Sequence, residues 1–179
     1  CNRNRVPRRS KSQLTPKGGN VNIFILDTDI KKCAENHCDK HVIKMILESA
    51  QMLSTVSRLH GGHVGYKSTH KNHPCTLWAG KSLTNWFWLQ KLTTYLNDEY
   101  KFRYNKEINH KSYEVARSLV VPDIPNIGLT PFAQAMPEQY KNKNAVTAYR
   151  QYYLNEKTNL LKWTKRNQPN WTEAEQCIL

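Results

Sequence analysis

The sequence predicts a mainly α protein: a single compact helical domain with at most a short N-terminal strand, preceded by a basic arm. Two observations lead to this fold class. Apolar and aromatic side chains recur at helical spacing in several long segments, and polar or proline- and glycine-rich stretches separate these segments. A chain of 179 residues also has room for one domain with a real core.

Residues 1–20 form a separate basic unit that contains no acidic residue. Its six cations are Arg3, Arg5, Arg8, Arg9, Lys11 and Lys17. Because the segment has almost no apolar side chains, it cannot bury a core of its own. We therefore predict a flexible arm that becomes ordered on a partner such as a phosphate backbone. A remnant of a transit peptide is the alternative.

The helical domain is predicted to occupy residues 21–179. Residues 21–26 are apolar and β-branched, which predicts a short strand. The candidate N-caps for the next helix, which runs to about residue 37, are Asp27, Thr28 and Asp29. A longer helix follows from about Asp39 to Leu59, and a polar loop begins at two consecutive glycines.

Four further helices are predicted from Pro74 onward. Pro74 itself suits the first turn of the first of them. The most aromatic segment, about 82–104, has helical spacing, and another helix is predicted over about 111–119. Prolines break regular structure over about 120–142, and a loop of this length is usually functional or bound to a partner. The last helix is predicted over about 144–165.

The charge of the chain narrows the class of partner. It carries 27 Lys and Arg against 14 Asp and Glu, a formal net charge of +13. Such a surface favours DNA or RNA, and less strongly an anionic membrane. No apolar run approaches the length that spans a bilayer, and no signal-peptide core is visible. We expect a soluble intracellular protein without a membrane partner, in the cytoplasm of a host cell or an organelle matrix.

Cysteine and histidine residues do not predict a metal or a cofactor. The cysteines are odd in number and irregularly placed, which indicates reduced thiols: Cys1, Cys33, Cys38, Cys75 and Cys177. Cys33, His37 and His41 are spaced by four, but the chain has no Cys-x-x-Cys pair and its histidine spacings match no standard zinc template. Hydrogen-bonded or surface histidines are the default. Cys38 and Cys75 lie near histidines, yet buried inert thiols are more common than nucleophiles.

The segment from residue 38 to residue 48 combines an amphipathic pattern with chemically useful side chains. His41, Lys44 and Glu48 are spaced by three and four, which places them on one face of a helix. An imidazole, an amine and a carboxylate on one rigid element are a common basis for acid/base sites. We therefore name these three as candidate catalytic residues. The solvated face of an ordinary helix is the alternative.

Outside the arm, cations are interleaved with aromatic and amide side chains in two places. These patterns suit phosphate contact combined with base stacking. The candidate nucleic-acid-binding residues here are Lys67, Lys71, His73 and Arg103. A solvated basic face of no functional consequence is the alternative.

Residues 22–165 resemble a family of small, mostly uncharacterised phage-encoded proteins, which brings no established activity. The resemblance rests on Asn22-Ile23-Phe24, on the segment 38–48, on His70-Lys71-Asn72-His73-Pro74-Cys75, and on the segments 127–137 and 148–153. A second resemblance is to the phage-type pyrimidine-dimer DNA glycosylases. The order Asp-x-His, six residues, Glu is matched by Asp39, His41 and Glu48, and the helix after His73 is similar to their next helix.

The second resemblance implies a compact helical enzyme that attacks the sugar of a damaged nucleotide with its N-terminal α-amine. A catalytic Glu stabilises the ring-opened imine and promotes strand cleavage, and by resemblance Glu48 takes this role with His41 assisting. The sequence departs from the pattern in two ways. Twenty residues precede the expected position of the amine near Val21, and Leu47 and Gln51 replace arginines that flank the family's Glu.

Two functions therefore stay open, and with them whether the chain is an enzyme. The first is a DNA glycosylase and abasic-site lyase that acts on damaged DNA, with the α-amine or Lys44 as nucleophile. The second is a non-enzymatic RNA-binding structural subunit of a ribonucleoprotein, such as a mitochondrial ribosome, on a glycosylase-like scaffold. The position of the N-terminus discriminates them: an amine within about 4 Å of the Glu48 carboxylate supports catalysis, and an arm extended over RNA supports a scaffold.

Overall fold

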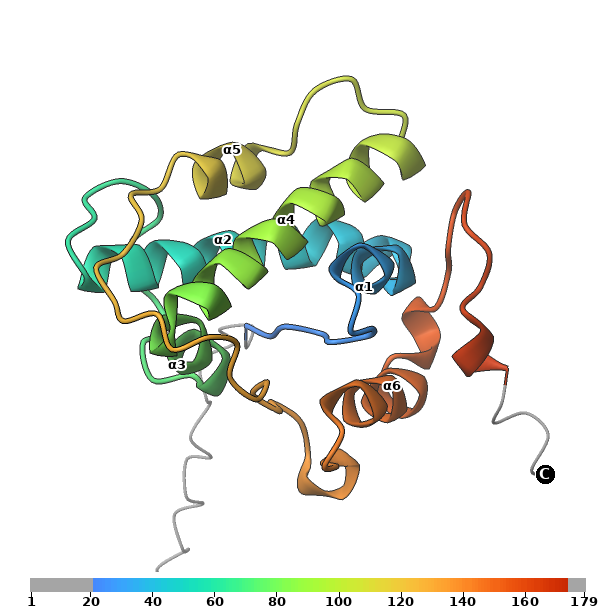
Figure 1. Cartoon of the computed structure of the whole chain (residues 1–179). Helices are drawn as coiled ribbons and strands as arrows, with labels where there is room; N and C mark the ends of the chain where they lie inside the picture. Colours follow the sequence, from blue (N-terminus) through green and yellow to red (C-terminus); the bar gives the residue numbers. More distant parts are fainter. Residues whose placement is uncertain (1–20, 174–179) are drawn as a thin grey trace, which may run out of the picture.

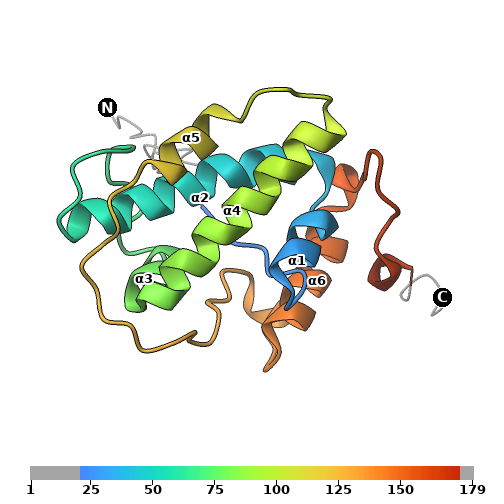
Figure 2. The same cartoon turned by 45° about the horizontal axis from the view of Figure 1, so that its top comes forward.

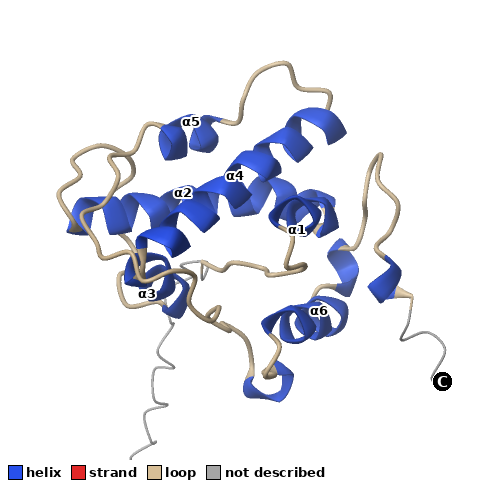
Figure 3. Cartoon of the chain, viewed as in Figure 1, coloured by secondary structure: helices blue, strands red, loops and turns tan. Residues whose placement is uncertain are grey.

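The structure is a computed structural model that describes residues 21–173, so the predicted arm over 1–20 lies outside the described residues. The described chain forms six α-helices and three short 3-10 helices (Figure 3). Its buried apolar side chains gather in one cluster. The prediction of a compact, mainly α fold is confirmed. Within the described residues, no helix is long and apolar enough to cross a membrane.

Two long helices, α2 (Asp39–Leu59) and α4 (Leu83–Arg103), form the centre of the molecule. They pack against each other, and α4 crosses α2 in the views of both Figure 1 and Figure 2. The short helix α1 (Ile30–Asn36) packs on α4, and α5 (Lys111–Arg117) packs mainly on α2. Helix α3 (Pro74–Lys81) contacts both long helices. These bounds agree with the predicted helices to within about two residues.

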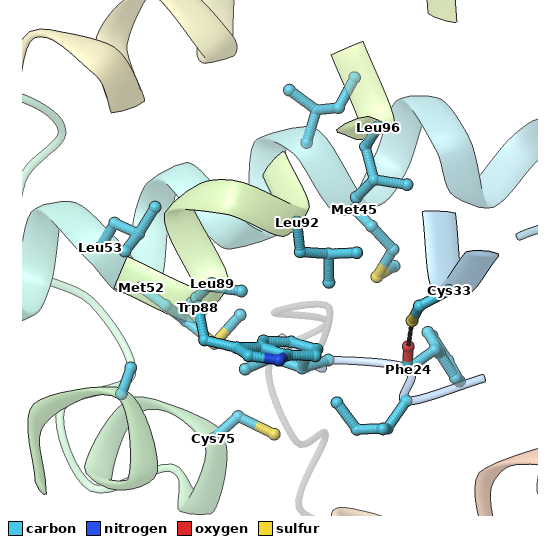
Figure 4. Packing of buried hydrophobic residues seen from close by; sticks show 14 of the residues in the cluster. Phe24, Cys33, Met45, Met52, Leu53, Cys75, Trp88, Leu89, Leu92 and Leu96 are labelled. Carbon is cyan, nitrogen blue, oxygen red and sulfur yellow. Dashed lines mark hydrogen bonds between the residues drawn. The ribbon is translucent and has the colours of Figure 1, made fainter. Parts of the chain in front are cut away.

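The segment 21–26, which was predicted to be a strand, is buried and extended but pairs with no strand in the described chain. It runs between the α2–α4 layer and α6 (Figure 1). Side chains satisfy its backbone instead: Glu48 accepts the Asn22 N–H, and the Cys33 thiol donates to the Phe24 carbonyl at 3.2 Å (Figure 4). The prediction of a strand was wrong because β-branched, apolar composition reports burial rather than the presence of a pairing partner.

The core is built largely from α2, α4 and the extended segment. Met45 and Met52 of α2 and Leu89 and Leu92 of α4 contribute to it (Figure 4). Trp86 is fully buried. Its indole N–H donates a hydrogen bond to a backbone carbonyl of α2 at 3.3 Å. Burial of large aromatic rings with a paired polar atom stabilises a core of this size efficiently.

The last predicted helix was expected over 144–165, but α6 (Ala145–Glu156) ends earlier and is followed by a 3-10 turn, η2 (Thr158–Leu160). After η2 the chain turns away from the axis of α6, because hydrogen bonds hold it against the α1–α2 region. The Trp163 indole donates to the Asn36 carbonyl at 3.0 Å, and the Lys162 carbonyl accepts the Asp39 N–H. Helical spacing alone therefore overestimated the length of this helix.

Arg103, predicted to bind nucleic acid, is instead part of the interior. Its side chain is 0% exposed, and it forms ion pairs with Glu99 at 2.7 Å and with Asp39 at 3.3 Å. Two backbone carbonyls of the α1 region accept its remaining donors, those of Glu35 and His37. Since a buried guanidinium with this many partners cannot reach a phosphate, the prediction for Arg103 was wrong.

Candidate active site

A cavity of about 610 Å³ opens beside α2. Its walls come from the extended N-terminal segment, from α2, from the start of α3, from the loop over 135–137 and from α6. Four residues predicted from the sequence line it together: His41, Lys44, Glu48 and His73. The structure thus brings the whole predicted catalytic face of α2 to one concave surface.

Glu48 is the buried carboxylate of this cavity, with 5% of the residue exposed. Its Oε2 accepts the backbone N–H of Asn22 at 3.0 Å, and its Oε1 lies 3.5 Å from Nζ of Lys44. Burial raises the pKa of Glu48, whereas the Lys44 charge and the Asn22 N–H oppose this shift. A carboxylate that is more basic than usual and has cavity access is suited to accept and return protons.

Lys44 lies one turn before Glu48 on the same helix, and its side chain is 56% exposed. The pair therefore joins a solvent-facing amine to a buried carboxylate at the cavity wall. At 3.5 Å between Nζ and Oε1, the amine and the carboxylate form an ion pair. The α-amine, whose distance from Glu48 was the criterion to discriminate the two functions, lies outside the described residues.

His41 is held as a neutral ring. It stacks on Phe24 with ring centroids 4.7 Å apart, and its Nδ1 lies 2.9 Å from the Tyr153 hydroxyl. Burial lowers the pKa of His41 to about 3. The Tyr153 hydroxyl also accepts the Cys38 N–H, and in the His41 tautomer with its ring proton on Nε2 the Tyr153 proton goes to Nδ1. In that tautomer His41 can donate a hydrogen bond from Nε2.

His73 has the same tautomer for a different reason. It is the N-cap of α3, and its Nδ1 accepts the Cys75 N–H at 3.2 Å. Burial is the main cause that lowers the pKa of His73, so the neutral ring carries its proton on Nε2. His73, which was predicted to bind nucleic acid as part of a basic loop, lines the cavity and carries a neutral donor there.

Asn22 is a site residue that sequence reasoning missed. Its Nδ2 donates to the Ala135 carbonyl at 2.9 Å, and its Oδ1 accepts the Tyr149 hydroxyl at 3.2 Å. The Cys75 thiol also approaches Oδ1, at 3.6 Å. These contacts immobilise the residue whose backbone N–H binds Glu48. The available signal was a single amide side chain within an otherwise apolar segment.

Lys157 and Tyr152 were also missed, because they lie far from α2 in the sequence. Both line the cavity, and Nζ of Lys157 sits 5.1 Å from the centre of the Tyr152 ring. Burial dominates the pKa shifts of Glu48 and His41, and the positive charge of Lys157 acts on each toward a lower pKa. Lys157 thus contributes to the electrostatics of the site.

The remaining candidates do not join the cavity. Lys67 and Lys71 are exposed on the loop between α2 and α3 and are absent from its walls. The basic residues of the arm, from Arg3 to Lys17, lie outside the described residues. Over residues 21–173, no group of three or more His, Cys, Asp or Glu side chains is placed to hold a metal ion.

The thiols near the site are buried and unpaired. Cys33, Cys38 and Cys75 are free. Burial raises the pKa of Cys33 to about 12 and that of Cys75 to about 11. At neutral pH both therefore stay protonated, and their roles are packing and hydrogen bonding rather than nucleophilic attack.

Comparison with known proteins gave one family. Residues 21–112, just over half of the chain, match the family model described as pyrimidine dimer DNA glycosylase. The match includes the extended segment, α2 and α3, and it ends before Tyr152 and Lys157. Neither the curated proteins nor the solved structures gave a match.

Proposed function

Because the chain belongs to the pyrimidine dimer DNA glycosylase family, we propose that it removes damaged bases from DNA and cleaves the strand at the resulting abasic site. One observation carries the proposal: Lys44 Nζ lies 3.5 Å from the buried Glu48 carboxylate, in the wall of a cavity of about 610 Å³. That volume lies within the range of ligand sites in proteins. Enzymes that act on a base commonly extrude the nucleotide into such a pocket.

In the first step, Lys44 supplies the nucleophile. Glu48 accepts a proton from the Lys44 ammonium, and the free amine attacks C1′ of the damaged deoxyribonucleotide. The bond between C1′ and the base breaks, and the base leaves with the bonding electron pair and takes up the proton that Glu48 had accepted, which regenerates the Glu48 carboxylate. The nitrogen then gives one of its two protons to O4′ as the C1′–O4′ bond opens, which leaves a protonated imine between Lys44 and C1′.

In the second step, Glu48 acts as the base for strand cleavage. Its carboxylate removes a proton from C2′, and the electron pair forms a C2′–C3′ double bond as the C3′–O bond to the phosphate breaks. Water then hydrolyses the imine and releases Lys44. The neutral His41 and His73 rings donate hydrogen bonds from Nε2 to the sugar or to the departing base, and so support the developing charge.

Borohydride trapping tests this proposal, because reduction of the imine links the protein covalently to abasic DNA. We expect the wild type to be trapped and Lys44→Ala to lose trapping. The matched control is Lys40→Ala, which removes an exposed lysine one turn earlier on the same helix and should be trapped normally.

Peptide mapping of the trapped product identifies the amine. A link at a residue other than Lys44 in the wild type would show that another amine is the nucleophile. A wild type that neither cleaves dimer-containing or abasic DNA nor is trapped would contradict the enzymatic proposal. The RNA-binding alternative would then be tested by direct RNA binding.

A further inference from the structure

The cavity contains a second ammonium group whose role the reaction above does not use. Lys157 is the C-cap residue of α6, and its side chain is partly buried. Its Nζ lies 5.1 Å above the Tyr152 ring, a cation–π contact that restricts where the ammonium can sit. Tyr152 in turn packs against Phe24 and Tyr140, with ring centroids 6.1 and 5.7 Å away. The ammonium is therefore held by an ordered aromatic group.

The charges around the cavity leave Lys157 without an anionic partner. Among the described residues that line the cavity, Glu48 is the single carboxylate, and it is paired with Lys44. No described carboxylate lies within ion-pair distance of Lys157. Since burial keeps His41 and His73 neutral, the cavity carries a net positive charge that Lys157 supplies.

We propose that Lys157 binds a phosphodiester group adjoining the nucleotide whose sugar lies against Glu48 and Lys44. This inference rests on the proposed function. A deoxyribose in the cavity brings a phosphate at each of its 3′ and 5′ oxygens, and the buried Glu48 carboxylate repels both. A pre-positioned ammonium offsets that repulsion and fixes the register of the strand, as phosphate contacts generally do.

The geometry separates the roles of the two amines. Lys44 lies within 3.5 Å of the Glu48 carboxylate and can exchange a proton with it, whereas Lys157 is held over the ring of Tyr152 in α6. Lys157 also lies beyond residues 21–112, so the family match assigns it no role. It is thus a candidate substrate-binding residue contributed by the C-terminal part of the chain.

The test measures binding and turnover of Lys157→Met and Lys157→Arg. The binding probe is duplex DNA with a tetrahydrofuran abasic-site analogue, which cannot form an imine. We expect Lys157→Met to weaken binding about tenfold and to reduce the log–log salt slope by about 0.9, the share of one phosphate. Lys157→Arg should restore both. With abasic DNA, the Met variant should raise KM about tenfold, with a much smaller change in kcat.

Lys162→Met is the matched control, because it removes an exposed lysine from the neighbouring segment. A purely long-range charge effect would weaken binding equally in both Met variants and would overturn the inference. So would a Lys157→Met protein that binds with wild-type affinity and salt slope, or one that keeps its KM but cannot be trapped with borohydride. A wild type without cleavage or trapping would instead contradict the proposed function itself, so the two failures are distinguishable.

Discussion

At the scale of single residues, Glu48 shows how tertiary surroundings convert an ordinary side chain into a reactive one. A glutamate in the middle of a helix is normally solvated, but here the extended segment covers it and the Asn22 N–H and the Lys44 ammonium stabilise its charge. Desolvation outweighs these partners, and the pKa of Glu48 is therefore raised. His41 experiences the same burial without a charged partner, and it stays neutral.

We predict that Glu48→Gln abolishes strand cleavage at damaged or abasic sites while DNA affinity changes less than about threefold. Glutamine keeps the volume and can still accept the Asn22 N–H, but it cannot take a proton from Lys44 or from C2′. Single-turnover cleavage assays and anisotropy titrations measure the two quantities. Cleavage by the variant at more than a few per cent of the wild-type rate would contradict the role of Glu48.

The same variant should change the pH dependence of stability in a defined direction. Because the folded-state pKa of Glu48 lies above its usual value of 4.5, the folded protein holds this proton more tightly than the unfolded chain does. The stability that this group contributes is therefore present below pH 4.5 and is lost as pH rises through the folded-state pKa. In Glu48→Gln this loss should be absent, which urea denaturation at several pH values can measure against the wild type.

At the scale of secondary-structure elements, an ionic cluster joins α2 and α4 to the C-terminal segment. Glu99 of α4 binds Arg103 on the same helix and Arg166 from the C-terminal segment, and Arg103 reaches Asp39 at the start of α2. The Thr164 hydroxyl donates to Asp39 at 2.6 Å. Helical periodicity predicted the helices but could not reveal this cluster, because the partners are up to 125 residues apart.

We predict that Arg103→Met destabilises the fold by about 3–5 kcal/mol, because it removes the buried charge that Glu99 and Asp39 share. Lys91→Met, an exposed substitution on the same helix, should change the free energy of unfolding by less than about 0.5 kcal/mol. Urea denaturation measures both. An Arg103→Met protein with unchanged stability and weakened DNA binding would restore the original prediction that Arg103 contacts nucleic acid.

At the scale of the whole molecule, net charge and its distribution govern the encounter with a polyanion. The chain carries +13 overall, and six of its cations fall in residues 1–20. We predict that removal of residues 1–20 reduces the magnitude of the log–log salt slope for DNA binding by about 4–5, the counterion release expected if most of these cations meet phosphates. Equal salt dependence for the full chain and the shortened one would show that the arm does not clamp phosphates.

The sequence by itself determined the helical class, the positions of α2, α3 and α4, and the placement of His41, Lys44 and Glu48 on one helical face. These properties depend on local spacing, which the order of residues contains directly. Only the tertiary structure decided which groups meet that face. Asn22 reaches that face across 26 residues, Tyr152 and Lys157 reach it from more than 100 residues away, and Arg103 is withdrawn into the interior by its own long-range partners. Proximity across such separations is set by how the whole core packs, and no local pattern encodes it.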